Sequence, residues 1–318
     1  MRILRALRRH GVLGINRRNI DFTLRWNARR LYPLVDDKLT TKERCQSAEL
    51  PVPALLAVAR HHFEIPRLLR EIANLDAFAL KPAHGAMGNG ILVVRARDGA
   101  RYQLTGGRWL DEDDLRYHAA SIISGLYALG GQIDDAFVEE RIGVHPKLDG
   151  VATDGLPDLR VIVFRGVPVM SMTRLPTRRS GGRANLHQGA VGAGIDLTSG
   201  RFIHAVQDNV PVSRHPDTDQ ALVGLEMPHF EQALEIAVAA TDLTGLGYVG
   251  ADVVIDAARG PLILELNARP GLAIQLANLA GLLPRLEAVG ARLEPGLSLA
   301  ARIALGREIA QDARRLCA

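Results

Sequence analysis

The chain has 318 residues, of which 47% are hydrophobic and 23% charged, and its formal net charge is +4. This composition is ordinary for a globular protein, and the length supports either two domains or one domain built of lobes. Aromatic residues make up only 4% of the chain, so stacking platforms for single-stranded nucleic acid are not favoured.

The cysteines and the hydropathy pattern narrow the class of protein further. Cys45 and Cys317 have no metal-ligand spacing and give no disulfide framework, which fits a reducing compartment. No apolar run reaches the roughly 18 residues of a membrane span, and the first residues lack the hydrophobic stretch of a signal peptide. We therefore expect a cytoplasmic protein.

The start of the chain carries an excess of positive charge. Nine arginines accompany a single acid, Asp21, and they are Arg2, Arg5, Arg8, Arg9, Arg17, Arg18, Arg25, Arg29 and Arg30. Ile3, Leu4 and Leu7 interleave with the first of them at near-helical spacing. Such a basic amphipathic helix could bind the inner membrane face or a polyanionic partner, and an arginine-rich start also mimics a transit peptide. The alternative, which we favour, is that residues 1–35 form a basic helical segment packed on the main body or across a homo-oligomer.

Residues 36–135 are predicted to alternate between helices and strands. The stretch "VDDKLTTKERCQSAEL" predicts a helix that ends before the next proline, with Thr40 or Thr41 as its N-cap. Residues 63–104 indicate a helix, a strand, a glycine loop and two strands joined by a tight Asp-Gly turn. A capped amphipathic helix follows and is expected to close at the glycine pair 130–131.

The stretch "ALKPAHGAMGNGILVV" is a candidate phosphate-binding loop. It places Lys81 at a strand end, before a loop that contains Gly85, Gly88 and Gly90. Glycines let backbone N–H groups approach an anion closely, and a neighbouring lysine supplies fixed charge. The loop returns into a strand, so it matches neither a Walker motif nor a dinucleotide-binding fingerprint, and an ordinary turn is the simpler interpretation. Lys38, expected to precede the first helix, has a solvated surface lysine as its simpler interpretation.

Residues 136–318 begin with the strand "AFVEERI", in which Glu139 and Glu140 face opposite sides. A carboxylate at such a strand end can accept a hydrogen bond from an adenine amino group, although an exposed strand end is the simpler interpretation. The stretch "PDLRVIVFRGVPVMSMTRLPT" then predicts a hairpin that turns at residues 165–166 and carries Arg160 at the start of an inner strand.

The next stretch, "RRSGGRANLHQGAVGAGIDL", is predicted to be a loop rich in glycine and arginine. Its polar members suited to a phosphate or a carboxylate are Arg178, Arg179, Arg183, Asn185 and His187. Solvated basic loops are common, but asparagine and histidine among glycines are less easily dismissed. A strong helix that ends at a glycine follows in "MPHFEQALEIAVAATDLTGLG".

Residues 248–272, "YVGADVVIDAARGPLILELNARPGL", contain three polar groups in otherwise apolar runs. A hairpin centred between residues 258 and 259 places Asp252 directly opposite Glu265, with Cβ atoms about 5 Å apart. Asn267 lies two residues further, on the same face of its strand. Two carboxylates and an amide oxygen on one face suit Mg²⁺ and its bound phosphates, although some of these groups could instead point to solvent.

The order of these features carries a family resemblance. Along the chain they are Lys38, Lys81 with its glycine loop, the two adjacent glutamates, "DLR", "NLHQG", Asp252 and "ELNARPGL". This series resembles the ATP-grasp ligases, and within them the RimK-type branch, whose alpha-L-glutamate ligase-related and sugar-transfer-associated members are nearest. The resemblance covers roughly residues 36–290. Hairpins alternating with helices already indicate an α+β protein with antiparallel sheets, and the resemblance implies that two such lobes grip ATP between them.

The resemblance also implies the boundaries of the lobes and the residues that contact ATP. The N-terminal lobe would span residues 36–135, and the C-terminal lobe with the metal site would span 136–318. The residues implied to contact ATP are Lys38, Lys81, Gly85, Gly88, Gly90, Glu139, Glu140, Arg141, Ile142 and Asn185. The two lysines would hold the α- and β-phosphates under the glycine loop, the first glutamate would take the adenine amino group, and the backbone after it would read the ring.

The remaining implied roles concern metal and catalysis. Asp252, Glu265 and Asn267 would bind two Mg²⁺ ions, for which Mn²⁺ could substitute. Arg160 would steady the transferred γ-phosphoryl group, with Arg269 as a second catalytic candidate. Arg183 and His187, together with Arg269, would lie toward the acceptor or the carboxylate substrate.

The activity implied is that of an ATP-dependent carboxylate–amine ligase, which would add a glutamate-like amino acid to a carboxylate-bearing acceptor through an acylphosphate. No nucleic-acid partner is expected. One alternative is an ATP-binding regulatory or scaffold protein that has lost chemistry, against which the joint presence of Arg160 and the three metal-binding candidates argues. Another is a basic nucleic-acid binder, suggested by the isoelectric point of about 9.3. Only about 35 residues precede Lys38, where RimK-type enzymes carry a complete domain, so the substrates and the oligomeric state stay open.

Overall fold

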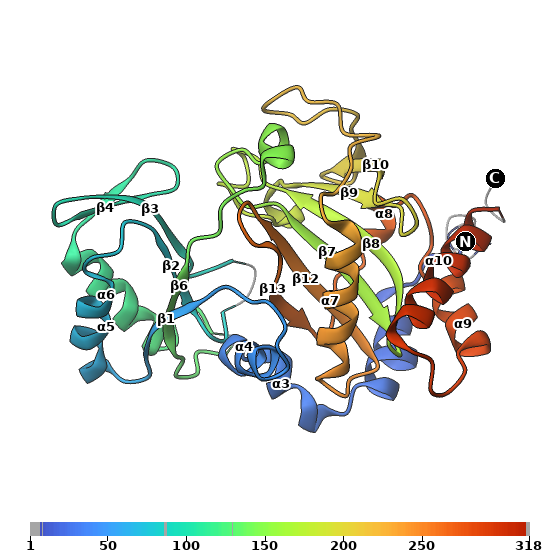
Figure 1. Cartoon of the computed structure of the whole chain (residues 1–318), viewed down its shortest axis with the longest axis horizontal. Coiled ribbons are helices and arrows are strands. Elements are labelled where there is room, and N and C mark those ends of the chain that lie inside the picture. The colour runs from blue at the N-terminus through green and yellow to red at the C-terminus, as the bar shows by residue number, and fades with distance from the viewer. Residues whose placement is uncertain (1–6, 8, 86–87, 129, 316–318) are drawn as a thin grey trace.

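The computed structural model describes residues 7, 9–85, 88–128 and 130–315, which form two lobes, each built on an antiparallel sheet (Figure 1). The smaller sheet has the strand order β1-β6-β2-β3-β4-β5. Its strands are β1 (Leu55–Ala59), β2 (Phe78–Pro82), β3 (Leu92–Asp98), β4 (Arg101–Leu104), β5 (Trp109–Leu110) and β6 (Ala136–Glu140). The expected α+β architecture is confirmed.

The larger sheet has the order β11-β10-β9-β8-β7-β12-β13. Its strands are β7 (Asp158–Phe164), β8 (Val167–Leu175), β9 (Val191–Ile195), β10 (Phe202–Gln207), β11 (Val210–Pro211), β12 (Tyr248–Asp256) and β13 (Gly260–Asn267). Every residue of β7 is buried, and its alternate side chains enter two different cores: Leu159 and Val161 enter one, and Ile162 and Phe164 the other. The centre of this sheet is therefore covered on both faces.

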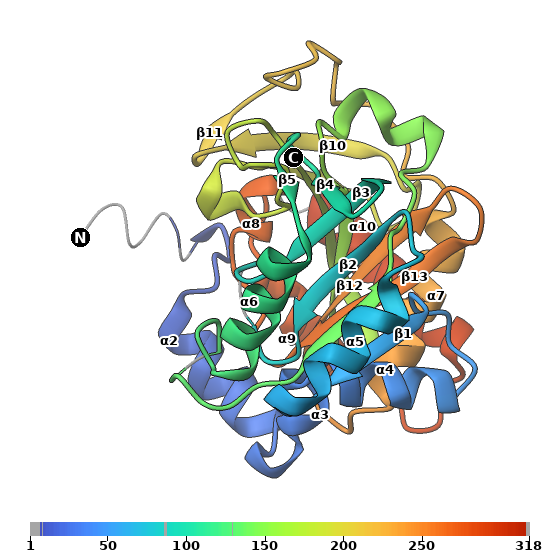
Figure 2. The ribbon, with the colours of Figure 1, turned by 90° about the vertical axis from the view of Figure 1, so that its left-hand side faces the viewer.

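The smaller lobe packs α5 (Ile65–Ile72) and α6 (Glu112–Ile123) on one face of its sheet, and Figure 2 views the molecule from this side. The buried side chains of α5 are Ile65, Leu68, Leu69 and Ile72. This spacing of three and four residues lines up one face of a helix, which explains why the stretch is helical. Asp111 caps α6 by accepting a hydrogen bond from the Asp114 backbone N–H.

Helices cover both faces of the larger sheet. They are α7 (Phe230–Asp242), α8 (Ile274–Ala277), α9 (Leu283–Arg292) and α10 (Leu299–Arg315), and short 3-10 turns lie at His62–Glu64, Pro146–Val151 and Leu186–Gln188. α7 contacts β12 and β13, whereas α9 and α10 contact β8. No helix within the described ranges combines the length and apolarity that a bilayer crossing demands.

The N-terminal segment packs on the larger lobe. It comprises α2 (Ile15–Arg17), a π-helix (Arg18–Leu24), a 3-10 turn (Arg29–Leu31) and α3 (Pro33–Asp36). Leu13 and Phe22 are buried in the core that also contains Phe164, and the two phenyl rings meet edge to face with centroids 5.4 Å apart. Asn27 Nδ2 donates to the backbone carbonyls of Tyr248 and Ala268, at 2.7 and 2.9 Å. Residues 13–31 therefore pack on the larger lobe, as the packing interpretation expects, while Arg2, Ile3, Leu4, Arg5 and Arg8 lie outside the described residues.

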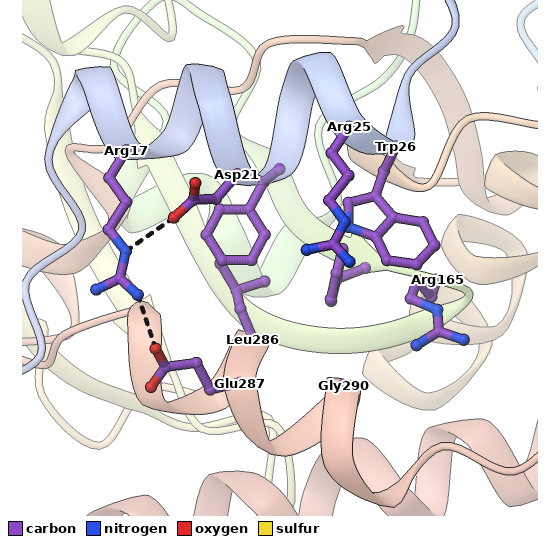
Figure 3. A pocket seen from close by; sticks show the side chains of 10 residues that line it. Arg17, Asp21, Arg25, Trp26, Arg165, Leu286, Glu287 and Gly290 are labelled. Atoms are coloured by element: carbon purple, nitrogen blue, oxygen red, sulfur yellow. Dashed lines mark hydrogen bonds and ion pairs between the residues drawn. The ribbon is translucent and has the colours of Figure 1, made fainter.

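A groove of about 370 Å³ runs between this segment and α9, and Figure 3 shows it. Arg17 spans it, with hydrogen bonds of 3.0 Å to Asp21 and 2.9 Å to Glu287. The Trp26 ring carries the guanidinium groups of Arg25 and Arg165 at 5.6 and 4.7 Å from its centroid. Arg17, one of the nine arginines, therefore links the segment to α9, and Arg165 of the larger lobe packs on the Trp26 ring.

Several local predictions are wrong. The N-cap of α4 (Lys38–Ser47) is Asp37, whose carboxylate accepts from the Leu39 and Thr40 backbone N–H groups, so Lys38 begins the helix instead of preceding it. α6 ends at Ile123, well before the glycine pair, because Gly125 turns the chain with a φ of +80°. The second half of the predicted glycine- and arginine-rich loop is the strand β9, and β1 and β10 were not predicted.

The topology also moves the expected lobe boundary at residues 135/136. β6 lies between β1 and β2 in the smaller sheet, so it belongs with the N-terminal lobe. α4 contacts β13, and Cys45 on α4 belongs to the core of the larger lobe. The chain therefore enters the larger lobe, leaves it to build the smaller one, and returns after β6.

Candidate active site

The hairpin of β12 and β13 brings the three predicted metal-binding side chains together. Asp252 pairs with Glu265 in the strand register, which confirms the predicted pairing. Asn267 Nδ2 lies 3.3 Å from Asp252 Oδ2 and 3.3 Å from Glu265 Oε1. The turn is centred on Ala258, half a residue from the predicted centre, and a register shift between Asp252 and Val253 restores the pairing.

The cations beside Asp252 are two arginines from neighbouring strands. Arg160 on β7 donates from Nε to Asp252 Oδ1 at 2.7 Å and from Nη2 to Oδ2 at 2.5 Å. Arg174 on β8 donates to the same Oδ2 at 2.8 Å and binds Asp158 through Nε at 2.8 Å. Glu265 lies 3.9 Å from Arg160. Two arginines and two buried aspartates therefore form one network.

Burial and the arginines act in opposite directions on these aspartates. Burial alone raises the pKa of a carboxyl group, but the Arg160 and Arg174 guanidinium groups hold the pKa of Asp252 well below its usual range. Burial raises the pKa of Asp158 to about 6, against the effect of Arg174 and with help from the Asp252 carboxylate. Asp252 is thus the ionised anchor of the network.

Sequence reasoning missed Asp158 and Arg174. Asp158 opens the "DLR" motif and, two residues before Arg160, shares its strand face. Arg174 is a charged residue within the otherwise apolar strand "VPVMSMTRL". A charge inside a buried strand needs a partner, so this pattern could have identified both.

The three polar side chains of the β12–β13 hairpin differ in how readily they could bind a hard cation such as Mg²⁺. Glu265 keeps 30% of its side chain exposed, whereas Asp252 is fully buried and its Oδ2 already accepts from both arginines. Among the described residues, Asp252 Oδ1 accepts a single hydrogen bond, from Arg160 Nε, and retains acceptor capacity. Rotating the Asn267 amide would turn its oxygen toward the carboxylates. Among the described residues no three His, Cys, Asp or Glu side chains converge on a metal position, so the amide is needed to complete the set.

The predicted lysines come from two elements. Lys38 Nζ donates to the backbone carbonyl of Gly85, and Lys81 Nζ is bound to Glu139. A third lysine, Lys42, lies one turn after Lys38 on α4, and its Nζ is 3.1 Å from Glu139 Oε2. Sequence reasoning missed Lys42, although its spacing of four residues from Lys38 puts both on one side of a helix.

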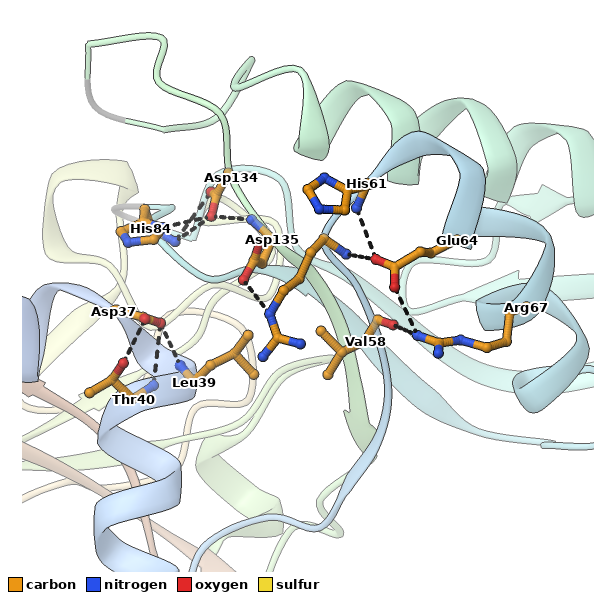
Figure 4. Close-up of polar contacts among 11 residues, drawn as sticks. Asp37, Leu39, Thr40, Val58, His61, Glu64, Arg67, His84, Asp134 and Asp135 are labelled. Carbon is orange, nitrogen blue, oxygen red and sulfur yellow. Dashed lines mark hydrogen bonds and ion pairs between the residues drawn. The ribbon is translucent and has the colours of Figure 1, made fainter.

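The glycine loop is anchored at His84, the residue before Gly85, as Figure 4 shows. The Asp134 carboxylate, which is fully buried, accepts from the His84 backbone N–H at 3.0 Å and meets His84 Nδ1 at 2.8 Å. Gly88 and Gly90 have φ values of +77° and +76°, a region that favours glycine. Residues 86 and 87 lie outside the described residues.

Groups from the two lobes meet around this loop. A Cβ atom on Gly88 would lie 3.4 Å from Arg183 Cδ, so the loop touches the arginine-rich loop of the larger lobe. Burial raises the pKa of Asp36, and the nearby charges of Arg269, His84 and Lys38 counteract part of this rise. Arg269 also lies over the Tyr32 ring, 5.0 Å from its centroid. In the arginine-rich loop, Asn185 Oδ1 accepts from the backbone N–H of the exposed His187.

The structure does not bring every predicted ATP contact to one place. The Glu140 carboxylate binds Arg259 and accepts from the Ala54 backbone N–H at 2.6 Å, so it links the end of β6 to the β12–β13 turn. Ile142 packs with apolar residues of that hairpin, and Arg141 is exposed. These contacts join the end of β6 to the larger lobe, and the roles of these residues toward ATP stay predictions.

The groups described above suit one class of ligand. Two lysines meet the buried Glu139 carboxylate, two arginines meet the buried Asp252 carboxylate, and a glycine loop follows Lys81 in the chain. This combination suits a polyphosphate and the cations it carries. No serine, cysteine or threonine nucleophile is part of the arrangement described above.

Comparison with known proteins gives a family match. A family model described as sugar-transfer associated ATP-grasp matches residues 17–291. No curated protein matches the sequence.

Solved structures give more distant similarities. The ATP-grasp ligase PsnB complexed with a minimal precursor is 18% identical, with a TM-score of 0.44, over 84% of this chain and 64% of that one. The same ligase with minimal precursor, Mg and ADP is 17% identical, with a TM-score of 0.43, over 84% and 61%. The D-alanine-D-alanine ligase from Coxiella burnetii is 15% identical, with a TM-score of 0.40, over 90% and 61%. The chain spans less than two thirds of the length of each of these proteins.

Proposed function

This chain belongs to the sugar-transfer associated ATP-grasp family, and we propose that it is an ATP-dependent carboxylate–amine ligase that forms an amide bond through an acylphosphate. The observation that carries the proposal is the convergence of Glu265, Asn267 and the arginine-bound Asp252 on the β12–β13 hairpin. The glycine loop of the other lobe, which reaches Arg183, supports it further.

The proposed reaction has two steps. A carboxylate oxygen of the first substrate attacks the γ-phosphorus of ATP in line, the bond from that phosphorus to the β-bridging oxygen breaks, and ADP leaves. The amine of the second substrate then attacks the acyl carbon, and inorganic phosphate leaves from the tetrahedral intermediate as the amine proton passes to solvent. Neither step needs a protein nucleophile, so catalysis rests on positioning and charge neutralisation.

The chain's own residues would supply this positioning and charge neutralisation. Lys38 and Lys81 would hold the α- and β-phosphates, and Arg160 would face the γ-phosphoryl group. Arg160 is pre-oriented because two of its nitrogens are bound to Asp252, which leaves Nη1 for a ligand. Mg²⁺, held by Glu265, Asn267 and Asp252 Oδ1, would neutralise charge that develops on the phosphates.

Within this function we propose a RimK-like acid–amino-acid ligase whose amine substrate is glutamate-like. Arg183, His187 and Arg269 are exposed cations or hydrogen-bond donors near the glycine loop or in the arginine-rich loop, and they would suit a substrate with a carboxylate of its own. The acceptor would be a second carboxylate-bearing molecule.

The test is a screen of amino acids and small carboxylates, singly and in pairs, for phosphate release from ATP with Mg²⁺. Mass spectrometry of the products should show a pair joined with loss of water, together with one ADP per bond formed. Tight ATP binding without ADP formation for any pair would contradict the ligase assignment and favour an ATP-binding regulatory protein.

A further inference from the structure

Glu139 lies almost fully buried between two lysines. The residue is 2% exposed, Lys81 Nζ is bound to its Oε1, and Lys42 Nζ lies 3.1 Å from its Oε2. The lysine side chains are themselves only 11% and 6% exposed. One carboxylate therefore meets two ammonium groups, which is one positive charge more than it can neutralise.

The two lysines differ in the number of acceptors that their ammonium groups contact. Lys42 Nζ also donates to the Pro53 backbone carbonyl at 2.6 Å, and Lys42 belongs to α4, which packs on the larger lobe. Among the residues that the structure describes, Glu139 is the only recorded acceptor for Lys81 Nζ. Lys81 is thus the lysine that can turn to an arriving phosphate, whereas Lys42 is fixed.

We propose that Lys42 is a positioning residue that sets the base selectivity of the nucleotide site. When Lys81 turns from Glu139 to the phosphates of ATP, Lys42 keeps the Glu139 carboxylate ionised and in place. An ionised carboxylate accepts a hydrogen bond from the 6-amino group of adenine and repels the 6-oxo group of hypoxanthine. This inference rests on the proposed function and deepens it by naming the residue that controls the choice of nucleotide.

The electrostatics of the buried site support the proposal. Burial favours the neutral form of Glu139, but Lys81 and Lys42 together hold its pKa below the usual range. The neighbouring Glu140 carboxylate is engaged by Arg259 and the Ala54 backbone N–H. With Lys81 turned away and Lys42 removed, the buried carboxyl would lose both charges that favour its ionised form, while burial would still favour the neutral form. A protonated carboxyl donates a hydrogen bond and so no longer rejects a 6-oxo group.

Calorimetric binding of ATP and of ITP to the full chain, with Mg²⁺, near pH 7 and near pH 9, tests this role. Wild type should prefer ATP by about tenfold or more at both pH values. Lys42→Met should lower the ratio of ATP affinity to ITP affinity by about threefold or more near pH 7. The ratio should rise from pH 7 toward pH 9, because a higher pH favours the ionised carboxyl. Lys42→Arg should keep the wild-type ratio, since it restores the charge.

Each contrary outcome has a distinct meaning. A folded Lys42→Met protein with the wild-type ratio at both pH values overturns the inference and leaves the proposed function intact. Failure of the wild-type protein to bind either nucleotide overturns both. If Lys42→Met does not fold, the ratio of ATP affinity to ITP affinity is measured on Glu139→Gln instead. An amide offers both a hydrogen-bond donor and an acceptor at any pH. The ratio should then fall and lose its pH dependence, and an unchanged ratio overturns the proposal.

Discussion

At the scale of single residues, two carboxylates that face each other across one hairpin have different surroundings. Asp252 is fully buried and bound by two arginines, whereas Glu265 keeps 30% of its side chain exposed and has its nearest arginine 3.9 Å away. Loss of the negative charge of Asp252 should therefore destabilise the fold, whereas loss of the charge of Glu265 should affect turnover.

Glu265→Gln should abolish turnover and leave the fold intact. The amide keeps the shape of the side chain but removes the charge that we assign to Mg²⁺ binding. The measurements are ADP formation with the best substrate pair and the melting temperature without nucleotide, which should stay equal or rise because Glu265 repels Asp252. Glu226→Gln is the matched control, since Glu226 is exposed and pairs with the exposed Arg201. A folded Glu265→Gln protein that consumes ATP at the wild-type rate would remove Glu265 from the metal site.

Asp252→Asn should destabilise the protein by about 3 to 5 kcal/mol at neutral pH, because it leaves the buried Arg160 and Arg174 without their shared anion. Urea denaturation measures this loss. The folded-state pKa of Asp252 lies below its ordinary value of 3.8, so its stabilisation is present at neutral pH and is lost as the pH falls below about 4. The stability difference between wild type and variant should therefore shrink in acid. An equal difference at pH 7 and pH 3 would contradict the assigned ionisation.

The sequence predicts residue positions well where they depend on local pairing. Asp252, Glu265 and Asn267 converge as expected because a hairpin register is fixed by a short turn and the alternation of side chains. Arg174 faces Asp158 directly across the predicted β7–β8 hairpin, so local pairing could have identified that contact. The contacts of Arg174 with Asp252 and of Lys42 with Glu139 join segments far apart in the chain and escaped prediction. Such contacts depend on how strands and helices assemble and not on spacing along the chain.

At the scale of elements, the glycine loop between β2 and β3 is constrained at both ends. His84 is bound to the buried Asp134 at the start of the loop. At its end, the Gly90 carbonyl oxygen accepts a hydrogen bond from His118 Nε2 at 2.8 Å, and a Cβ atom on Gly90 would lie 2.5 Å from the Tyr127 ring. The smaller lobe therefore holds the chain on both sides of the loop, at His84 and at Gly90.

Gly90→Ala should weaken ATP binding by about tenfold or more, because the added methyl group must push Tyr127 or the loop aside. Calorimetry with ATP and with adenosine separates a phosphate effect from a base effect, and only ATP should lose affinity. Gly107→Ala is the matched control, because Gly107 also has a positive φ, of +90°, but has open space around its Cβ position. Equal losses for both ligands, or for both variants, would show that the loop does not hold the phosphates.

The sequence also predicts many elements, and its errors have local causes. The hairpins at residues 165–166 and 257–259 were predicted from turn residues between β-branched runs. The start of α4 was assigned to a threonine because Asp37, the true cap, lies within a run of acids and a lysine that reads equally well as loop. β1 and β10 were missed, although they are no shorter than the predicted β2 and β6. Each takes its strand geometry from its neighbours in the sheet, and the pairing of each contains a register shift.

At the scale of the whole molecule, the N-terminal segment behaves as part of the larger lobe. One face of the segment supplies Leu13, Phe22 and Asn27 to the interior, while Ile20 and Leu24 are 63% and 66% exposed on the other. The inner contacts are those of a folded core, so the net charge of the segment does not by itself indicate a separate partner. The sequence could not decide this point, because the apolar surface that receives Phe22 is built from residues more than a hundred positions away.

The last prediction compares removal of the segment with point changes on its two faces. A chain that starts at Leu34 should melt at a lower temperature and lose activity, because it uncovers the core around Phe164 and Tyr248. Phe22→Ala should cost about 3 to 5 kcal/mol of unfolding free energy, whereas Leu24→Ala, its exposed control, should change it by less than about 0.5 kcal/mol. Sedimentation with anionic liposomes at low salt provides the opposing measurement. The packing interpretation predicts that the full chain stays in the supernatant. It is wrong if the full chain sediments while the shortened chain keeps the wild-type melting temperature and activity and no longer sediments, since the segment would then act as a membrane anchor and not as a part of the core.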